Sequence, residues 1–210
     1  MSEPQAPLRI LAFAGSLRRN SHNGRLLDTA AQIAPPGMVL TVHDTIADVP
    51  LFDEDVEAST PSPDGVTRLR IAVAAADGVL IATPEYNQSL PGVLKNTLDW
   101  LSRDDAELGE VLSGKPVAIF GATPGKWGTR LAQSQLRHAL AAMGALTMPA
   151  PQLYMAEIAS SYDAASDTFD AATRKRLLAF LEGFEAWVGK RLGRARAPCS
   201  LRLVSGEIQY

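Results

Sequence analysis

The sequence predicts an α/β fold in which a doubly wound parallel sheet of five strands carries helices on both faces. Short apolar runs alternate with segments of helical spacing along the chain, which is the pattern of a parallel sheet buried on both sides. The 210 residues, 46% of them hydrophobic and 20% charged, are enough for one domain with its own core. We place this domain at residues 1–192 and leave residues 193–210 as a tail of undefined structure.

Each predicted strand is an apolar run bounded by glycine, proline or polar residues. The first run breaks at Gly15, and the third follows Asp77 at the end of a helical pattern. The fourth opens after Lys115 and ends at Gly121, whereas two prolines interrupt the fifth. The predicted strands are 8–14, 38–43, 78–82, 117–120, and a short fifth strand made of 144–148 with 153–154.

The predicted helices have apolar residues three and four positions apart, with a start or stop signal at several ends. Pro91 marks one start, Pro35-Pro36-Gly37 ends the first helix, and Asp77-Gly78 closes the second. The long last helix carries only core-type apolar residues on its inner face. The predicted helices are 24–33, 66–76, 92–101, 130–143 and 169–192.

Residues 44–65 form a long acidic and proline-containing connection that we predict to be a loop. Loops of this length in a compact domain are usually functional or disordered. An interface or a lid over a substrate is one interpretation, and a solvated acidic surface is the other.

Bulk properties exclude several classes of protein. The net charge of −3, from 20 basic and 23 acidic residues, gives no broad attraction to nucleic acid or to an anionic membrane surface. No apolar run approaches the roughly 20 residues of a membrane span, and the start of the chain has no targeting pattern, so we expect a cytoplasmic protein. Cys199 is the single cysteine, which excludes an internal disulfide.

Three polar loops follow the first, third and fourth strands. Five strands of this pattern suit the spatial order 2-1-3-4-5, in which those three strands are neighbours. Ligands of open α/β sheets bind outside the carboxyl ends of the strands. The three loops, 15–23, 83–91 and 122–129, are therefore expected to meet at one site.

The first loop is suited to phosphate. It contains serines, arginines and asparagines before a helix, and the N–H groups of a helix N-terminus bind anions. It lacks the glycine patterns of dinucleotide folds and P-loops, so a monophosphate is the better expectation. The alternative is a plain helix start in which Ser21 or Asn23 only caps. The third loop, with two glycines, could likewise be an ordinary turn.

Taken together, these motifs resemble the NADPH-dependent FMN reductase family, and within it the bacterial chromate and quinone reductases. The resemblance rests on Gly15-Ser16-Leu17-Arg18 with Ser21 and Asn23, and on the stretch from Thr83-Pro84-Glu85-Tyr86-Asn87 to Asp99-Trp100. Smaller matches at residues 50–53, 114–117 and 135–137 extend it over about residues 8–192. It implies a flavodoxin-like fold and bound FMN.

The family's cofactor contacts map onto all three loops. In the family the first loop holds the FMN phosphate, the second borders the flavin ring and ribityl chain, and the third approaches the other edge of the ring. Many relatives have serine or threonine at positions 121 and 122, so contacts there would rely on the backbone. The implied contacts are Ser16, Arg18, Ser21, Asn23, Pro84, Glu85, Tyr86, Asn87, Ala122, Thr123 and Gly125.

The implied activity needs no catalytic residue from the protein, because the flavin carries the chemistry. NADPH or NADH would donate hydride in a ping-pong scheme to a quinone, azo dye, free flavin or metal oxyanion such as chromate. A homodimer or homotetramer is expected by resemblance. The scattered His22, His43 and His138 suggest no metal site. The alternatives are a flavodoxin-type electron carrier that NADPH does not reduce, and a flavin-free interaction protein.

Overall fold

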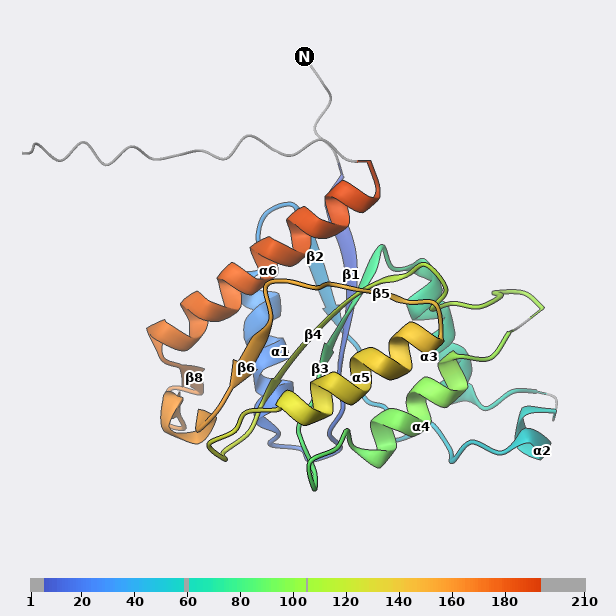
Figure 1. Ribbon diagram of the computed structural model, residues 1–210, viewed down its shortest axis with the longest axis horizontal. Helices are drawn as coiled ribbons and strands as arrows, with labels where there is room; N and C mark the ends of the chain where they lie inside the picture. The colour runs from blue at the N-terminus through green and yellow to red at the C-terminus, as the bar shows by residue number, and fades with distance from the viewer. Residues whose placement is uncertain (1–5, 59–60, 105, 194–210) are drawn as a thin grey trace, which may run out of the picture.

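The structure confirms a parallel sheet with the order β2-β1-β3-β4-β5 and helices on both faces (Figure 1). It is a computed structural model that describes residues 6–58, 61–104 and 106–193, so residues 194–210 of the expected tail, including Cys199, lie outside the described residues. The elements in chain order are β1 (Leu8–Ala14), α1 (His22–Ile33), β2 (Met38–Val42), α2 (Glu54–Glu57), α3 (Asp64–Ala75), β3 (Gly78–Ala82), α4 (Gly92–Leu101), β4 (Pro116–Ala122), α5 (Arg130–Ala142), β5 (Leu146–Thr147), β6 (Leu153–Met155), the 3-10 helix η1 (Ile158–Ser161), β7 (Tyr162–Asp163), β8 (Thr168–Phe169) and α6 (Ala171–Arg191).

The core divides into two layers, one on each face of the sheet. Alternate side chains of a strand point to opposite faces. Ile10 and Ala12 of β1 therefore join the cluster that contains α1 and α6, whereas Leu11 and Phe13 join the cluster that contains α3, α4 and α5. Strands β3 and β4 are buried along their whole length, as expected for a sheet covered on both sides.

The fifth position of the sheet is occupied by two short strands rather than by the single strand that the sequence predicted. Leu146 in β5 pairs with Pro116 at the start of β4, and Leu153 in β6 pairs with Phe120 near its end. Pro149 and Pro151 lie between the two strands. Because proline has no N–H to give to a ladder, it interrupts the pairing there.

The connection predicted as a loop at 44–65 contains the short helix α2 and the start of α3, and α4 holds its first half in place. Asn96 of α4 accepts a hydrogen bond from the Phe52 N–H at 2.7 Å and donates to the Pro50 carbonyl at 2.8 Å. The indole N–H of Trp100 donates to the same carbonyl at 2.8 Å. Leu51, between the two fastened residues, is 82% exposed.

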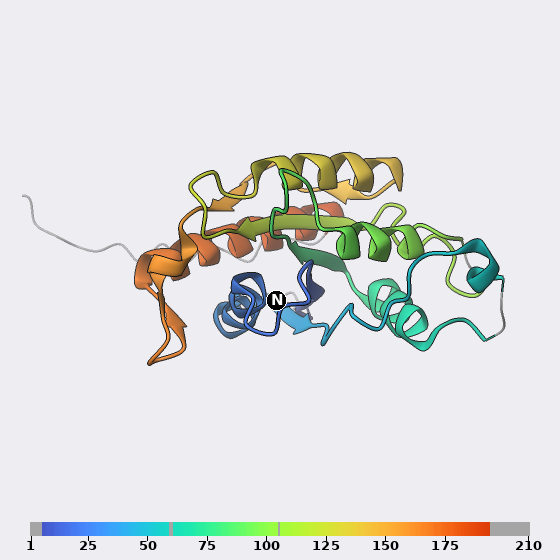
Figure 2. The same cartoon turned by 90° about the horizontal axis from the view of Figure 1, so that it is seen from below.

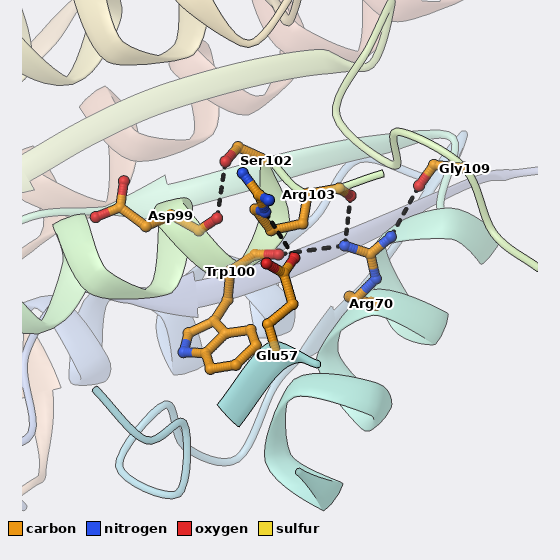
Figure 3. A network of polar contacts seen from close by, with 7 residues as sticks. All are labelled: Glu57, Arg70, Asp99, Trp100, Ser102, Arg103 and Gly109. Atoms are coloured by element: carbon orange, nitrogen blue, oxygen red, sulfur yellow. Dashed lines mark hydrogen bonds and ion pairs between the residues drawn. The ribbon is translucent and has the colours of Figure 1, made fainter. Parts of the chain in front are cut away.

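A buried arginine organises the carboxyl end of α4 (Figure 3). Arg70 of α3 is only 4% exposed. Its guanidinium donates to the carbonyls of Trp100 at 3.2 Å, Arg103 at 2.7 Å and Gly109 at 2.8 Å. These carbonyls belong to the last turn of α4 and the chain after it, where a helix leaves acceptors without partners of its own. A cation is favourable there because the helix dipole is negative at that end.

Between β6 and α6 the chain forms η1 and the β7–β8 hairpin, which the sequence pattern did not indicate. Tyr162 of the hairpin packs against Phe169 with ring centroids 5.1 Å apart, and the Arg25 guanidinium of α1 lies 4.2 Å from the Tyr162 ring. The hairpin is therefore docked onto the first turns of α1. Across the part of the chain that the structure describes, no helix has the length and apolar character to cross a membrane.

Candidate functional site

Three loops meet at one edge of the sheet, as the strand order predicted. Ala14 at the end of β1 pairs with Ala82 at the end of β3, and Ala82 pairs with Phe120 of β4. The central strands therefore end at about the same level, and the loops after them leave on the same side (Figure 2). We number these loops one to three: loop 1 is 15–21, loop 2 is 83–91 and loop 3 is 123–129.

Loop 1 presents a set of anion-binding groups at the start of α1. Ser21 is the N-cap and accepts a hydrogen bond from the Asn23 N–H at 3.2 Å, and the first turn of α1 contains no acidic residue. Arg18 and Arg19 are exposed, and neither forms an ion pair with a carboxylate in the described ranges. Ser16 Oγ accepts from the Arg18 N–H at 3.3 Å.

The side chain of Asn23 ties α1 to the end of β4. Its Nδ2 donates to the Ala122 carbonyl at 3.0 Å, and its Oδ1 accepts from the Ala122 N–H at 2.9 Å. Asn23 and Ala122 are each 2% exposed. Both were predicted to contact the cofactor, but each uses these groups to bind the other. The structure thus gives the pair a role in holding loop 1 beside loop 3.

Loop 2 contains a tight reversal. Tyr86 and Ser89 exchange two backbone hydrogen bonds of 3.0 Å, and Asn87 and Gln88 between them have φ angles of 51° and 62°. Two consecutive residues with positive φ are characteristic of a type I′ turn. The Tyr86 side chain is half exposed, and its hydroxyl lies 3.4 Å from Ser16 Oγ of loop 1.

Glu85 of loop 2 caps the start of α5. Its Oε2 accepts from the N–H groups of Leu131 at 2.9 Å and Ala132 at 3.0 Å. The local N-cap residue, Thr129, makes no side-chain capping bond. The sequence analysis assigned Glu85 to the cofactor and did not foresee this capping role. The available signal was a helix start at 130 with no acidic residue in its first turn.

The helix α5 also holds the tip of loop 2. Gln135 Oε1 accepts from the Ser89 hydroxyl at 2.6 Å, and its Nε2 donates to the Gln88 carbonyl at 3.2 Å. Farther along α5, Arg137 donates to the Met148 carbonyl at 2.8 Å. The Gln135-Leu136-Arg137 motif of the sequence therefore connects α5 to two neighbouring segments.

Loop 3 is fastened at its root to the chain that follows β6. Thr123 donates through its N–H to the Met155 carbonyl at 3.0 Å and accepts from the Ile158 N–H at 3.2 Å, and the Gly125 carbonyl accepts from the Glu157 N–H at 3.0 Å. Glu157 adopts a left-handed conformation with φ of 50°. The start of loop 3 is thus bonded to the end of β6 and the residues after it, while residues 124–127 are exposed to solvent.

Gly121, just before loop 3, has no room for a side chain. A Cβ at this position would lie 2.2 Å from both the Thr83 carbonyl oxygen and Thr129 Oγ1. A serine or threonine would not fit here without a shift of the Thr83 backbone, directly after β3. The first side-chain hydroxyl that this edge can offer in loop 3 therefore belongs to Thr123.

The predicted cofactor residues fall into two groups by burial. The buried group, which shapes the loops, consists of Ser21, Asn23, Pro84 and Ala122. The group that reaches the surface of this edge consists of Ser16, Arg18, Glu85, Tyr86, Asn87, Thr123 and Gly125.

His22, the first residue of α1, was expected to have a structural or surface role. Its Nδ1 is buried and finds no hydrogen-bond partner among the described residues. Burial lowers the pKa of His22, and the positive charges of Arg18 and Arg25 lower it further. The described ranges contain no group of three histidine, cysteine or acidic residues that could hold a metal ion.

Comparison with known proteins identifies the family. Residues 8–160 match the family model described as NADPH-dependent FMN reductase. The chain is 38% identical over 186 residues to an NAD(P)H-dependent FMN reductase of Pseudomonas aeruginosa, covering 89% of this chain and 98% of the relative. It is 40% identical over 184 residues to a 2-hydroxy-1,4-benzoquinone reductase of a Burkholderia species, covering 88% and 98%.

A solved structure agrees with these matches. The flavoenzyme FerB of Paracoccus denitrificans, an NAD(P)H:(acceptor) oxidoreductase, superposes with a TM-score of 0.77 at 33% identity, over 88% of this chain and 98% of FerB. Sequence, fold and site position lead to the same assignment. The chain therefore belongs to the NADPH-dependent FMN reductase family, whose enzymes use FMN and NAD(P)H.

Proposed function

We propose that this enzyme passes reducing equivalents from NADPH or NADH through FMN to small quinones, by a ping-pong scheme. The observation that carries the proposal is the meeting of an anion-binding helix start with two further loops at one edge of the sheet. The relatives named for FMN and for 2-hydroxy-1,4-benzoquinone reduction support it. Azo dyes, free flavin and metal oxyanions such as chromate are further acceptors that we propose from the family resemblance.

The residues of loop 1 fit the phosphate of FMN. The Ser16 hydroxyl and the exposed Arg18 guanidinium lie beside a helix N-terminus that has no acidic residue in its first turn. Such a set combines hydroxyl, charge-assisted and helix-end donors. We assign Ser16 and Arg18 to direct phosphate contact because they reach the surface, and we assign Ser21 and Asn23 to shaping the loop because both are buried and bonded inside the protein.

Loops 2 and 3 are assigned to the flavin ring and ribityl chain. Tyr86, whose hydroxyl lies 3.4 Å from Ser16 Oγ of loop 1, and Asn87 are exposed, and Thr123 and Gly125 lie in loop 3 directly after β4. Glu85 contributes indirectly, because its carboxylate holds the start of α5 and thereby fixes loop 2 against loop 3.

FMN supplies the hydride- and electron-transfer chemistry when it is bound, so the protein needs no nucleophile or general acid. The protein's own task is to hold the ring and leave one face open. Hydride transfer requires reacting atoms within roughly 3 to 3.5 Å. A nicotinamide and an acceptor that use the same open face in turn give ping-pong kinetics.

The test is anaerobic rapid mixing of the FMN-loaded protein with NADPH and with NADH, followed by steady-state rates with quinone, azo, flavin and chromate acceptors. We expect direct bleaching of the oxidised flavin and parallel lines in double-reciprocal plots. A flavin that nicotinamides do not reduce would favour the electron carrier. A colourless protein that fails to bind FMN would favour the flavin-free interaction protein.

We also propose that the enzyme is a homodimer or homotetramer. Leu51 is 82% exposed although Pro50 and Phe52 on either side of it are held against α4. The expectation of an oligomer comes from the family resemblance, and we propose Leu51, an exposed side chain on a fixed segment, as a residue of the contact. Sedimentation velocity of the wild-type protein and of Leu51→Glu tests this: the variant is expected to sediment as a smaller species, and identical profiles would exclude Leu51 from the interface.

A further inference from the structure

Trp127, in loop 3, is 82% exposed. An indole can bury about 150 to 250 Å² of surface against a partner, so a tryptophan left in water forgoes a large favourable contribution. The other two tryptophans are used inside the fold, since Trp100 is 3% exposed and Trp187 packs on Phe184 with ring centroids 6.3 Å apart. Trp127 differs from both, because its indole is available for contact with a ligand.

The chain around Trp127 is fixed at both ends to the other two loops. Ala122, five residues before it, is bonded to Asn23 at the start of α1. Leu131, four residues after it, is bonded to Glu85 of loop 2. Trp127 therefore lies on the segment that connects the anchor points of loops 1 and 2, at the edge where we place the flavin.

The residues directly after Trp127 are also immobilised. Gly128 has φ of +68°, and a Cβ on it would lie 3.2 Å from the Cβ of Tyr154. Thr129 is fully buried. Residues 124–127, by contrast, are exposed. Trp127 is therefore carried on a fixed support with its side chain open to solvent, which is the arrangement of a preformed contact for a ligand.

The chemistry next to the indole narrows the ligand class. Lys126 is exposed, and no carboxylate in the described part of the chain forms an ion pair with it. An exposed indole and an exposed lysine that are adjacent in the sequence favour a planar, conjugated molecule with oxygen acceptors or negative charge. Quinones and hydroxyquinones have this shape and chemistry.

We propose that Trp127 determines acceptor selectivity: its indole stacks on planar quinoid acceptors, and it is not required for FMN binding or for reduction by NADPH. The proposal rests on the proposed function of the same edge. It separates planar acceptors, which gain the stacking contact, from compact acceptors such as ferricyanide, which cannot stack.

The kinetic test compares wild type, Trp127→Ala and Trp127→Phe, with Ile71→Ala as a control for the loss of an exposed apolar side chain elsewhere. For Trp127→Ala we expect the KM for 2-hydroxy-1,4-benzoquinone to rise roughly tenfold, as the loss of an aromatic contact predicts. The KM for ferricyanide, the FMN dissociation constant and the rate of reduction by NADPH should stay within twofold. Trp127→Phe should recover most of the loss.

Three results would overturn the proposal, and the first two concern a general disturbance of the site and a contact between copies. One is an equal rise in KM for ferricyanide and for the quinone, which indicates a general disturbance of the site. The other is a smaller sedimentation coefficient for Trp127→Ala, which would place the indole in a contact between copies. A slower reduction by NADPH would instead assign the indole to the nicotinamide, and also counts against the proposal.

A binding measurement keeps this test separate from the proposed function. Adding the quinone to oxidised FMN-loaded protein, without NADPH, should quench tryptophan fluorescence in wild type and much less in Trp127→Phe. Quenching without turnover would leave the Trp127 assignment standing and defeat the proposed reaction. Turnover with identical quenching in the two proteins would support the proposed reaction and overturn the Trp127 assignment.

Discussion

In two regions of the molecule, polar side chains form hydrogen bonds with backbone groups, but the two regions have different roles. Around Arg70, a buried guanidinium binds three carbonyls at the end of α4 (Figure 3). At the three-loop edge, Asn23 and Glu85 likewise bind backbone groups, but exposed side chains such as Arg18 and Tyr86 stand outside them. The Arg70 region, which we call the closed joint, only connects parts of the fold. The three-loop edge connects parts of the fold and also supports a surface that is open to ligands.

This difference teaches how to separate structural from ligand-binding polar residues. A buried polar group must have its hydrogen bonds satisfied within the protein. Asn23 meets that condition through the backbone of Ala122, and the two terminal nitrogens of Arg70 meet it through three carbonyls. Exposed polar groups are satisfied by water and can exchange it for a ligand. Burial, more than residue type, therefore indicates which of the predicted cofactor residues can touch FMN.

The largest expected effect is on the closed joint. Arg70→Met should lower the free energy of unfolding by about 3 to 5 kcal/mol, because three buried carbonyls lose a charged donor. Urea denaturation of the apoprotein measures it. The matched control is Arg103→Ala, whose exposed ion pair with Glu57 should contribute little to stability because water screens it. FMN affinity of the folded Arg70→Met protein should not change; a large change would mean that the two regions are coupled.

The next effect concerns the buried part of the three-loop edge. Asn23→Ala should lower the stability of the apoprotein by about 2 to 4 kcal/mol, because it leaves the N–H and carbonyl of Ala122 without partners. The control, Asn20→Ala, removes an exposed amide from the same loop and should stay within about 0.5 kcal/mol. If Asn23→Ala weakened FMN binding without loss of stability, Asn23 would be a direct cofactor ligand, as the family resemblance implies.

The exposed part of that edge should behave in the opposite way. Arg18→Ala should weaken FMN binding by about 1.5 to 3 kcal/mol, the usual contribution of a hydrogen bond to a charged group, and leave apoprotein stability unchanged. Isothermal titration with FMN and with riboflavin, which lacks the phosphate, measures it. Riboflavin affinity should be the same in both proteins. Arg19→Ala, with a neighbouring exposed arginine, is the matched control, and an equal loss there would remove the special role of Arg18.

The smallest effect is a pH dependence confined to the loop edge. Burial and two arginines lower the pKa of His22 in the folded protein, below the value near 6.5 of an unfolded chain. Below about pH 6.5 the unfolded state therefore binds more protons than the folded state, so the free energy of unfolding decreases as the pH is lowered. His22→Phe should show a smaller loss of stability between pH 7.5 and pH 5.5 than wild type. Equal losses of stability in the two proteins would show that groups other than His22 control the decrease at acid pH.

The sequence predicted the elements that depend on local pattern. β1, β3 and α4 have the predicted bounds, because each is a strong apolar pattern with a clear stop or start. α1 begins two residues earlier than expected, since Ser21 caps it. The strand order followed from the number and pattern of strands. The meeting of the three loops followed from that order.

What the sequence did not predict depends on contacts between distant residues. Glu85 accepts a hydrogen bond from the N–H of Leu131, which is 46 residues away in the sequence. Asn23 is 99 residues away from its partner, Ala122. No local pattern records such a pair, so both residues were assigned to the cofactor. The helix α2 is a single turn with its own cap, and the residue before that cap is held by α4. The break in the fifth strand depends on its register along β4.

The cross-links among the loops also bear on how a ligand arrives. Asn23, Glu85 and Gln135 hold all three loops by bonds within the protein, so the edge has its shape before any cofactor is present. A site of this kind is expected to bind by nearly rigid docking. The association rate of FMN should then be set by diffusional encounter and charge, and fall with ionic strength, rather than show a slow step of loop closure.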